Sequence, residues 1–107
     1  MKKKYSIIIP TYNGEKTITT LLEKVIFLIK NYTYEIIIID SESKDSTVKI
    51  INSYIKKYST IRLIKIKKKV FNHGSTRNLG VKLAKGEYLC FFSQDAYGKK
   101  NNREWFF

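Results

Sequence analysis

Four consecutive isoleucines, Ile36–Ile39, follow Glu35 and constrain the fold more than any other stretch of the chain. A strand without alternation of apolar and polar residues is typical of a parallel sheet that is covered on both faces. Shorter apolar runs at Tyr5–Ile9, which Pro10 ends, and at Tyr88–Phe92 predict further strands. We expect the run at Tyr88–Phe92 to be buried on both faces as well.

A fourth strand is predicted at Ile61–Ile66, where Arg62 and Lys65 alternate with apolar residues and indicate a position nearer the sheet edge. Between the predicted strands, apolar residues recur at the spacing of an α-helix. The first helix is expected over Lys16–Lys30, with the apolar stripe Ile18, Leu21, Leu22, Val25, Ile26 and Ile29. The second carries the stripe Val48, Ile51, Tyr54, Ile55 and Tyr58, with Asp45 or Ser46 as its N-cap.

A third, shorter helix is expected to be capped by Ser75 or Thr76 and to run to Lys85, with Gly86 as its C-terminal glycine. Residues Asn101–Phe107 are expected to begin another helix. Alternating strands and helices predict an α/β fold: a doubly wound, mainly parallel sheet of about four strands, with helices on both faces and right-handed crossovers.

Composition indicates a single folded domain of 107 residues, with 43% hydrophobic and 14% aromatic residues. The formal net charge of +12 would attract phosphates, nucleic acid or an anionic membrane. The lysines are scattered, which favours a solvated surface over a dedicated polyanion site. A lone Cys90 within an apolar run indicates a buried structural thiol and a reducing compartment. No apolar run approaches the length of a membrane span, so we expect a soluble, cytoplasmic protein.

The loops that follow the strands hold the unusual polar residues and should gather at one end of the sheet: Pro10–Gly14, Asp40–Asp45, Phe71–Gly74 and Ser93–Asp95. Ligands of open α/β sheets bind beyond the carboxyl ends of the strands. A carboxylate there, Asp95, is placed to hold Mg²⁺ or Mn²⁺. The alternative for Asp95 is a turn aspartate beside a solvated tail.

Several motifs together carry a resemblance to a known family: Ile9-Pro10-Thr11-Tyr12-Asn13, Asp40-Ser41, Asp45-Ser46-Thr47, Phe71-Asn72-His73-Gly74, Thr76-Arg77-Asn78, Gly86 and Gln94-Asp95-Ala96. In order and spacing the chain resembles the family 2 glycosyltransferases, in the rhamnosyltransferase-like branch. The resemblance implies the GT-A fold, a nucleotide-diphosphate sugar, a divalent metal and inverting transfer. It covers residues 1–107 as the nucleotide-sugar (donor) binding part, truncated before the acceptor-binding half.

For the nucleotide base, the resemblance implies that Tyr12 lies against the ring, with Pro10 and Thr11 shaping that wall. Asp40 would accept a hydrogen bond from the imide N–H of uracil or thymine, and Glu15 would reach the ribose or base. Asn13, Ser41 and Gln94 belong to the same implied set. The alternatives are packing for Tyr12, a strand-end turn or helix cap for Asp40, and a first-turn acid for Glu15.

For the phosphates, the resemblance implies that Arg77 grips the diphosphate; a solvated cation on the helix is the alternative. Asn72, His73 and Asn78 would build the loop near the phosphates and sugar. Asp95 matches the last acid of the family's metal motif, and Ser93 stands where many members have the first. With one carboxylate, metal binding without nucleotide should be weak.

Three functions remain open. The first is the donor domain of a metal-dependent inverting glycosyltransferase that uses dTDP-rhamnose or a UDP-sugar. Its partners would be a glycan or lipid-linked saccharide acceptor and, peripherally, the inner face of the membrane. The second is a non-catalytic nucleotide-sugar-binding fragment, because the family's general base is an acid further downstream. The third is a basic nucleic-acid-binding module, which lacks a recognition motif, so we expect no nucleic-acid partner.

Overall fold

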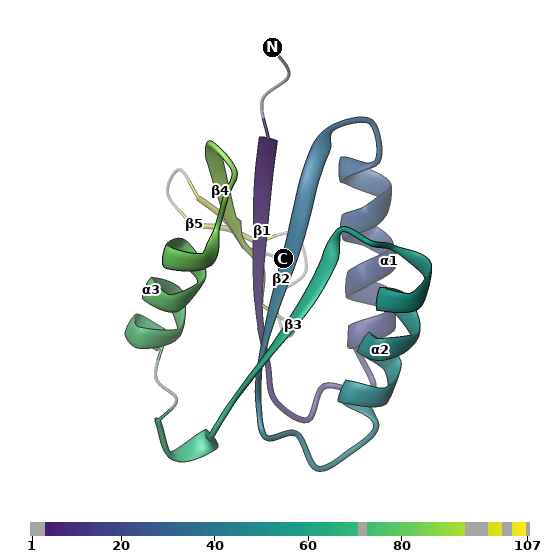
Figure 1. Ribbon diagram of the computed structural model, residues 1–107, viewed down its shortest axis with the longest axis vertical. Helices are drawn as coiled ribbons and strands as arrows, with labels where there is room; N and C mark the ends of the chain where they lie inside the picture. Colours follow the sequence, from purple (N-terminus) through teal and green to yellow (C-terminus); the bar gives the residue numbers. More distant parts are fainter. Residues whose placement is uncertain (1–3, 71–72, 94–98, 102–103, 107) are drawn as a thin grey trace.

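The computed structural model describes residues 4–70, 73–93, 99–101 and 104–106. Strands and helices alternate along the chain (Figure 1). The elements are β1 (Lys4–Thr11), α1 (Ile18–Ile29), β2 (Thr33–Ser41), α2 (Thr47–Lys57), β3 (Ile61–Ile66), the 3₁₀ turn η1 (Lys68–Val70), α3 (His73–Leu83), β4 (Tyr88–Phe91), β5 (Lys99–Asn101) and β6 (Glu104–Phe106). In this part of the chain, no helix is both long and apolar enough to cross a bilayer.

The first four strands form one parallel sheet in the order β3-β2-β1-β4. Ile7 of β1 is paired with Ile36 of β2 on one side and with Cys90 of β4 on the other. This arrangement confirms the predicted α/β sheet of about four parallel strands. It also confirms that β3, the strand with alternating charges, lies at an edge.

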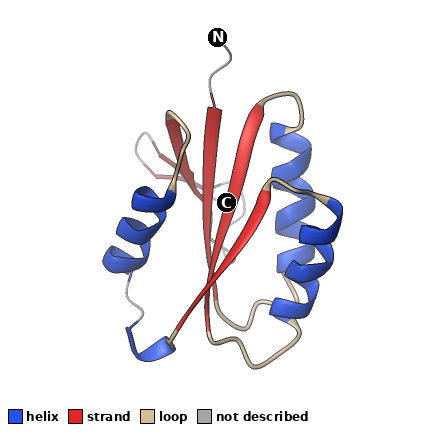
Figure 2. Cartoon of the chain, in the orientation of Figure 1, coloured by secondary structure: helices blue, strands red, loops and turns tan. Residues whose placement is uncertain are grey.

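Helices cover both faces of the sheet: α1 and α2 pack on one face and α3 on the other (Figure 2). The side chains of β2 alternate between these two layers, so Ile36 and Ile38 contact the α1 and α2 side. Ile37 and Ile39 contact the α3 side. All four are 0% exposed, which explains why the strand needs isoleucine at every position.

Strand β1 continues through Pro10 to Thr11, so the expectation that Pro10 ends it is wrong. The backbone N–H of Phe92 donates to the carbonyl of Ile8 at 3.0 Å, which shows that even-numbered residues of β1 turn their backbone groups toward β4. The pairing of β1 with β4 stops at Ile8 and Phe91. The N–H that proline lacks would therefore point beyond the paired part of β4, where its loss costs no ladder bond.

Helix α3 begins at His73, two residues before the first of the expected caps, so His73 and Gly74 belong to the helix and not to the loop. It ends at Leu83, and Gly86 is therefore not its C-terminal glycine. A Cβ atom at Gly86 would lie 2.6 Å from Ser6 Oγ and 2.8 Å from the carbonyl oxygen of Lys4. Glycine is needed there because the chain passes so close to β1.

Two expectations near the end of the chain are wrong. Strand β4 is not buried on both faces, since Tyr88 is 41% and Leu89 38% exposed. An apolar run alone does not distinguish a central strand from an edge strand, and β4 lies at the edge of the four-stranded sheet. Instead of a helix, β5 and β6 form an antiparallel pair, as the β-favouring Trp105 and Phe106 permit.

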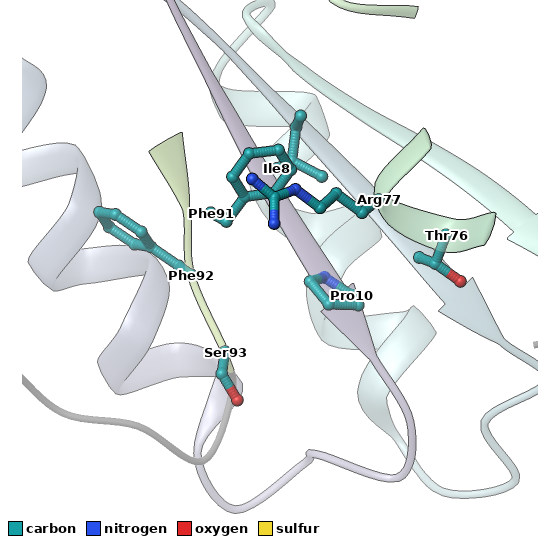
Figure 3. A pocket seen from close by; sticks show the side chains of 7 residues that line it. All are labelled: Ile8, Pro10, Thr76, Arg77, Phe91, Phe92 and Ser93. Carbon is teal, nitrogen blue, oxygen red and sulfur yellow. The ribbon is translucent and has the colours of Figure 1, made fainter. Parts of the chain in front are cut away.

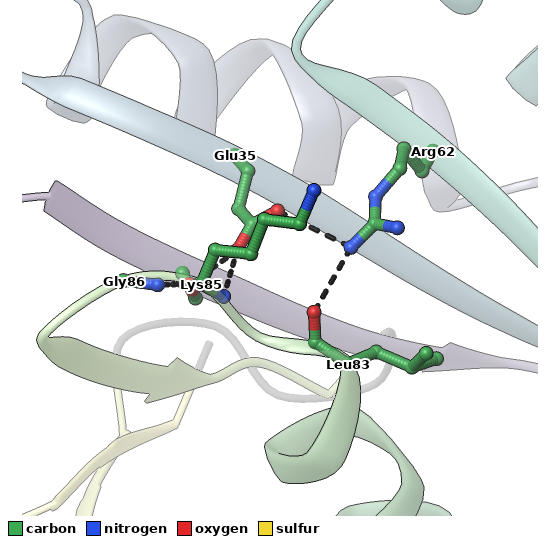
Figure 4. Close-up of polar contacts among 6 residues, drawn as sticks. Glu35, Arg62, Leu83, Lys85 and Gly86 are labelled. Carbon is green, nitrogen blue, oxygen red and sulfur yellow. Dashed lines mark hydrogen bonds and ion pairs between the residues drawn. The ribbon is translucent and has the colours of Figure 1, made fainter.

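At the amino end of the sheet, a buried carboxylate ties the strands to the segment after α3 (Figure 4). Glu35 Oε2 accepts hydrogen bonds from the Ser6 hydroxyl and from the N–H of Lys85, each at 2.6 Å. Arg62 contacts Glu35 Oε1 at 3.3 Å and donates to the carbonyl of Leu83 at 3.1 Å. Burial opposes the charge, but these hydrogen bonds and the nearby cations hold the pKa of Glu35 below its ordinary value.

Candidate nucleotide-sugar site

A cavity opens at the point where the direction of winding of the sheet reverses, between β1 and β4 (Figure 3). In open α/β sheets, ligands bind at such a switch point beyond the carboxyl ends of the strands. The cavity measures about 200 Å³. It is lined by residues from β1, α3 and the end of β4: Ile8, Pro10, Thr76, Arg77, Phe91, Phe92 and Ser93.

The walls of this cavity are mainly apolar, with two polar groups contributed by α3. The guanidinium carbon of Arg77 lies 4.5 Å from the ring centroid of Phe91, a distance at which cation and ring attract each other. Thr76 is 3% exposed, and its hydroxyl has no hydrogen-bond partner among the described residues. A guanidinium over an aromatic ring and an unpartnered hydroxyl in a small cavity suit an anionic ligand with hydrogen-bonding groups.

The loops after β1 and β2 are joined by a reciprocal pair of hydrogen bonds. The N–H of Asn13 donates to Ser43 Oγ at 2.8 Å, and the N–H of Lys44 donates to Asn13 Oδ1 at 2.7 Å. Asn13 has a φ of 46°, a left-handed conformation that asparagine tolerates better than most residues. The described contacts of Asn13 therefore hold the two loops together.

Glu15 and Asp45 strengthen this junction at the start of α2. The N–H of Glu15 donates to Asp45 Oδ2 at 3.2 Å, and Glu15 Oε1 accepts from the N–H of Ser46 at 3.3 Å. Glu15 precedes α1, so its interpretation as a first-turn acid of that helix is wrong. Ser46 occupies the N-cap position as expected, but Asp45 supplies the hydrogen bond by accepting from the N–H of Thr47 at 3.0 Å.

The pKa of Asp45 is accordingly lowered: desolvation acts against the charge, and the hydrogen bonds from Thr47 and Glu15 outweigh it.

Asp40 lies at the end of β2 and is 1% exposed. Its Oδ1 accepts from the Thr11 hydroxyl at 2.7 Å and from the Ser43 hydroxyl, while Oδ2 accepts from the N–H of Ser43 at 2.9 Å. These contacts confirm the turn interpretation of Asp40. They also place Thr11 beside Asp40 at the predicted sheet end. The neighbouring Ser41 is 1% exposed, and its hydroxyl has no partner in the described part of the chain.

Tyr12 is half-buried, and one face of its ring carries a lysine that sequence reasoning did not single out. The ammonium of Lys68 lies 4.2 Å from the ring centroid and 2.7 Å from the Tyr12 hydroxyl. The N–H of Lys68 donates to Glu42 Oε1 at 2.8 Å, so η1 is tied to both loops. Its place in the run Lys67–Lys69, directly after β3, is the only signal of this role in the sequence.

The remaining predicted residues divide into two groups. Arg77 lines the cavity, Asn78 is exposed on the same helix, and His73 begins that helix. Asn72, Gln94 and Asp95 lie outside the described residues. Among the residues that are described, no group of three or more His, Cys, Asp or Glu side chains could hold a metal ion. Sequence reasoning also did not assign Ile8, Thr76, Phe91 and Phe92 to the site, although Thr76 belongs to a quoted motif.

Comparisons with known proteins agree with this architecture. The sequence profile described as Glycosyl transferase family 2 matches residues 6–102. Poly(ribitol-phosphate) beta-glucosyltransferase of Bacillus spizizenii is 39% identical over 95 residues, which is 88% of this chain and 15% of that protein. The O-antigen chain rhamnosyltransferase RfbN of Salmonella typhimurium is 39% identical over 97 residues, covering 87% of this chain and 28% of its own.

A solved structure extends the likeness to three dimensions. The crystal structure of Staphylococcus aureus TarS 1-349 in complex with UDP-GlcNAc superposes with a TM-score of 0.73 at 33% identity. The superposition covers 86% of this chain and 26% of that one, so the chain spans a minor part of the length of its relatives. The structural neighbours are GT-A glycosyltransferases, as the motifs predict. The chain therefore belongs to glycosyl transferase family 2.

Proposed function

We propose that this chain binds the nucleotide-sugar donor of an inverting, metal-dependent glycosyltransferase. The donor is a pyrimidine nucleotide sugar, dTDP-rhamnose or a UDP-sugar, and the acceptor is a glycan or a lipid-linked saccharide. Family membership and the UDP-GlcNAc bound by TarS support a nucleotide-sugar donor, and the likeness to RfbN supports rhamnose among the candidates. The observation that carries the proposal is the cavity at the β1–β4 switch point, with Arg77 and Thr76 in its wall.

The base end of the proposed site is formed by the joined loops. Pro10, Thr11 and Tyr12 would supply its wall, and Asp40 would accept from the imide N–H. A carboxylate offers about four acceptor positions, and three described hydrogen bonds end on Asp40, which leaves capacity on Oδ2. Because Asp40 is 1% exposed, the base reaches it only if Ser43 shifts.

The phosphate end of the site is the cavity itself. Arg77 would pair with the diphosphate through its planar guanidinium, and the Thr76 hydroxyl is free to donate to an oxygen in the same cavity. Ser93 lines the cavity, and Asp95 follows it by two residues in the sequence, so we propose Asp95 as the protein ligand of the metal. The remaining ligands would come from the nucleotide's phosphates, and the bound ion would stabilise the leaving diphosphate.

Transfer also needs a general base that deprotonates the acceptor hydroxyl. We propose that this base belongs to an acceptor-binding part outside the 107 residues, since the chain spans 15% and 28% of the two relatives described above. The chain alone is then a donor-binding unit without transfer activity. Robust turnover by the purified chain with a matching donor would contradict this division of labour.

Calorimetric titration with UDP, dTDP, ADP and GDP tests the base assignment. We expect tighter binding of the two pyrimidine nucleotides, and Asp40→Asn should weaken it by about ten- to a hundredfold, the value of a hydrogen bond to a charged group. Glu87→Gln changes the net charge equally but lies before β4, at the opposite end of the sheet, so it serves as the matched control. Equal affinities for all four nucleotides, or equal losses in both variants, would contradict the role of Asp40.

The same titration in EDTA tests the metal. We expect Mg²⁺ or Mn²⁺ to raise nucleotide affinity, and Asp95→Ala to remove that gain without unfolding the chain, since binding of metal and nucleotide must be reciprocally coupled. If EDTA leaves the affinity of the unmodified chain unchanged, Asp95 is not a metal ligand.

A further inference from the structure

The edge of the sheet opposite the candidate site has a surface of its own. The helices run antiparallel to the strands, so the C-terminal ends of α1, α2 and α3 are directed toward the end of the sheet where the strands begin, which is the upper side of Figure 1. We call this end of the molecule, where the parallel strands begin, the amino edge; the name refers to the ends of the strands and not to the outer strands β3 and β4. The molecule is 40 Å long, and the cavity lies toward the carboxyl ends of the strands.

The amino edge is strongly basic. It carries six lysines from β1, from the ends of the helices and from the segments that follow them: Lys4, Lys30, Lys56, Lys57, Lys82 and Lys85. The acids that lie there in the described part of the chain are Glu35, which is buried against Arg62, and Glu87. Cations at helix C-termini stabilise the helix dipole, so these charges alone do not indicate a partner.

A second, independent feature lies at the same edge: large apolar side chains that the fold leaves exposed. Phe27 is 67%, Leu28 50%, Tyr32 54% and Tyr88 41% exposed. The ring of Tyr5 joins two of them, with centroid distances of 5.2 Å to both Tyr32 and Tyr88. We call these five residues the apolar patch: ring contacts join Tyr5, Tyr32 and Tyr88, and Phe27 and Leu28 lie in the last turn of α1. The ammonium of Lys30 lies 4.6 Å from the ring centroid of Phe27, so cation and aromatic ring are presented together.

We propose that the amino edge binds the surface of an anionic phospholipid membrane, with the apolar patch inserted at the level of the headgroups. Aromatic side chains favour the membrane–water interface, and lysines beside them attract anionic headgroups. Exposed aromatic rings beside lysines on one surface are typical of an interfacial contact. This inference concerns a surface outside the donor site and does not depend on which donor is bound.

The charges argue against the other occupant that the patch could take, a second copy of this chain. A symmetric dimer through the amino edge would bring the six lysines of one copy against the same six of the other, and like charges held together oppose association. An anionic lipid surface meets the same lysines with opposite charge. Charge complementarity therefore selects the membrane.

The placement of the two sites has a consequence for their use. A membrane bound at the amino edge would leave the cavity on the side away from the lipid, because residues near the carboxyl ends of β1 and β4 line the cavity. Vesicle binding and nucleotide binding should then not compete. This relation separates the proposal from simple adsorption of a basic protein, which would also cover the carboxyl end.

Flotation with vesicles tests the proposal, using phosphatidylcholine alone or mixed with phosphatidylglycerol. We expect binding to the anionic vesicles. Lys30→Glu should weaken it by about tenfold or more, since each lysine near such a surface contributes about a factor of five. Lys16→Glu is the matched control: it changes the net charge equally but lies between β1 and α1, at the carboxyl edge, and should change binding less than about twofold.

Because Lys30 contacts the Phe27 ring, Lys30→Glu could weaken binding by moving that ring, and two further variants separate charge from insertion. Lys56→Glu, at the end of α2, should weaken binding about as much as Lys30→Glu. Phe27→Ala removes an exposed side chain without a cavity and should weaken binding by about tenfold through lost insertion. Equal losses in Lys16→Glu and Lys30→Glu would overturn the assignment to the amino edge. So would an unchanged affinity of Phe27→Ala, or a dimer that Phe27→Ala dissociates and that does not bind anionic vesicles.

Discussion

Strand β2 carries a buried carboxylate near each end, and the two differ in how many of their hydrogen-bond donors are hydroxyls. Glu35, at the amino end, receives one hydrogen bond from the Ser6 hydroxyl and two from the N–H of Lys85 and the Arg62 guanidinium, which cannot accept in return. Asp40, at the carboxyl end, receives two of its three bonds from the hydroxyls of Thr11 and Ser43. Hydroxyls donate or accept by rotating. The first carboxylate is therefore fixed by its surroundings, whereas the second lies in surroundings that can adapt.

This difference fits a structural role for the amino end of the sheet and a ligand-binding role for its carboxyl end. The network around Glu35 joins β1, β2 and β3 to the chain after α3, and Ser6 Oγ in turn accepts from the N–H of Gly86 at 2.8 Å. The N–H groups of Lys85 and Gly86 and the Arg62 guanidinium can only donate, and the Ser6 hydroxyl is held between the N–H of Gly86 and Glu35, which suits a structural junction. At Asp40, a ligand N–H can be accommodated if Ser43 turns its hydroxyl, which suits a binding edge.

The largest effect that separates the two carboxylates is expected for Glu35→Gln. Both carboxylate oxygens face donors, so the amide NH₂ must point at Arg62 or at the Lys85 N–H. We expect a loss of about 2–3 kcal/mol in the free energy of unfolding, from a broken charge pair and a misdirected donor. Denaturant unfolding followed by circular dichroism measures it, and a loss below about 0.5 kcal/mol would show that Glu35 does not hold the sheet end.

Acidification tests the same carboxylate with a smaller expected effect, because only the difference between its charged and neutral forms is lost. The pKa of Glu35 in the folded chain lies below its ordinary value of 4.5. Its contribution is therefore fully present above that pH and is lost as pH falls through the folded pKa. Comparing unfolding free energies of the unmodified chain and Glu35→Gln between neutral and acidic pH should show their difference shrinking on the acid side. A constant difference would contradict the shift.

The smallest effect is expected for Asp40→Asn. The asparagine Oδ1 can still accept from the N–H of Ser43, and its NH₂ can donate to the hydroxyls of Thr11 and Ser43 once these rotate. We expect a loss of unfolding free energy below about 1 kcal/mol, although the same variant should weaken nucleotide binding strongly. The same unfolding experiment decides. If Asp40→Asn destabilises the chain as much as Glu35→Gln does, the donors around Asp40 are not adaptable and the contrast fails.

The fold was largely predictable because its determinants are local. The run Ile36–Ile39 needs cover on both faces, and the charges in Ile61–Ile66 indicate an edge strand. The errors arose where contacts between distant segments decide. Gly86 is required by its distance to β1 and not by the end of a helix, and the exposure of β4 depends on its place in the sheet.

The placement of the candidate residues in the fold was easier to predict than their contacts. Thr11, Asp40 and Arg77 do lie toward the carboxyl end of the sheet, because parallel strands end together. The sequence does not reveal which partners an acid or a lysine finds across loops. The contact between Lys68 and Tyr12 spans 56 residues, and the exchange between Asn13 and Lys44 spans 31. The roles assigned to the nucleotide-binding residues remain predictions for the titrations above.

The reciprocal hydrogen bonds between Asn13 and the Ser43–Lys44 segment have a consequence for protein engineering. A segment taken from a relative to change donor preference could not replace the loop after β1 alone. The residue at position 13 would have to donate to Ser43 Oγ and accept from the N–H of Lys44 in the unchanged loop after β2. The segments after β1 and β2 form one transplantable unit, and grafts that move residues 12–17 and 42–46 together should keep the geometry that either graft alone would destroy.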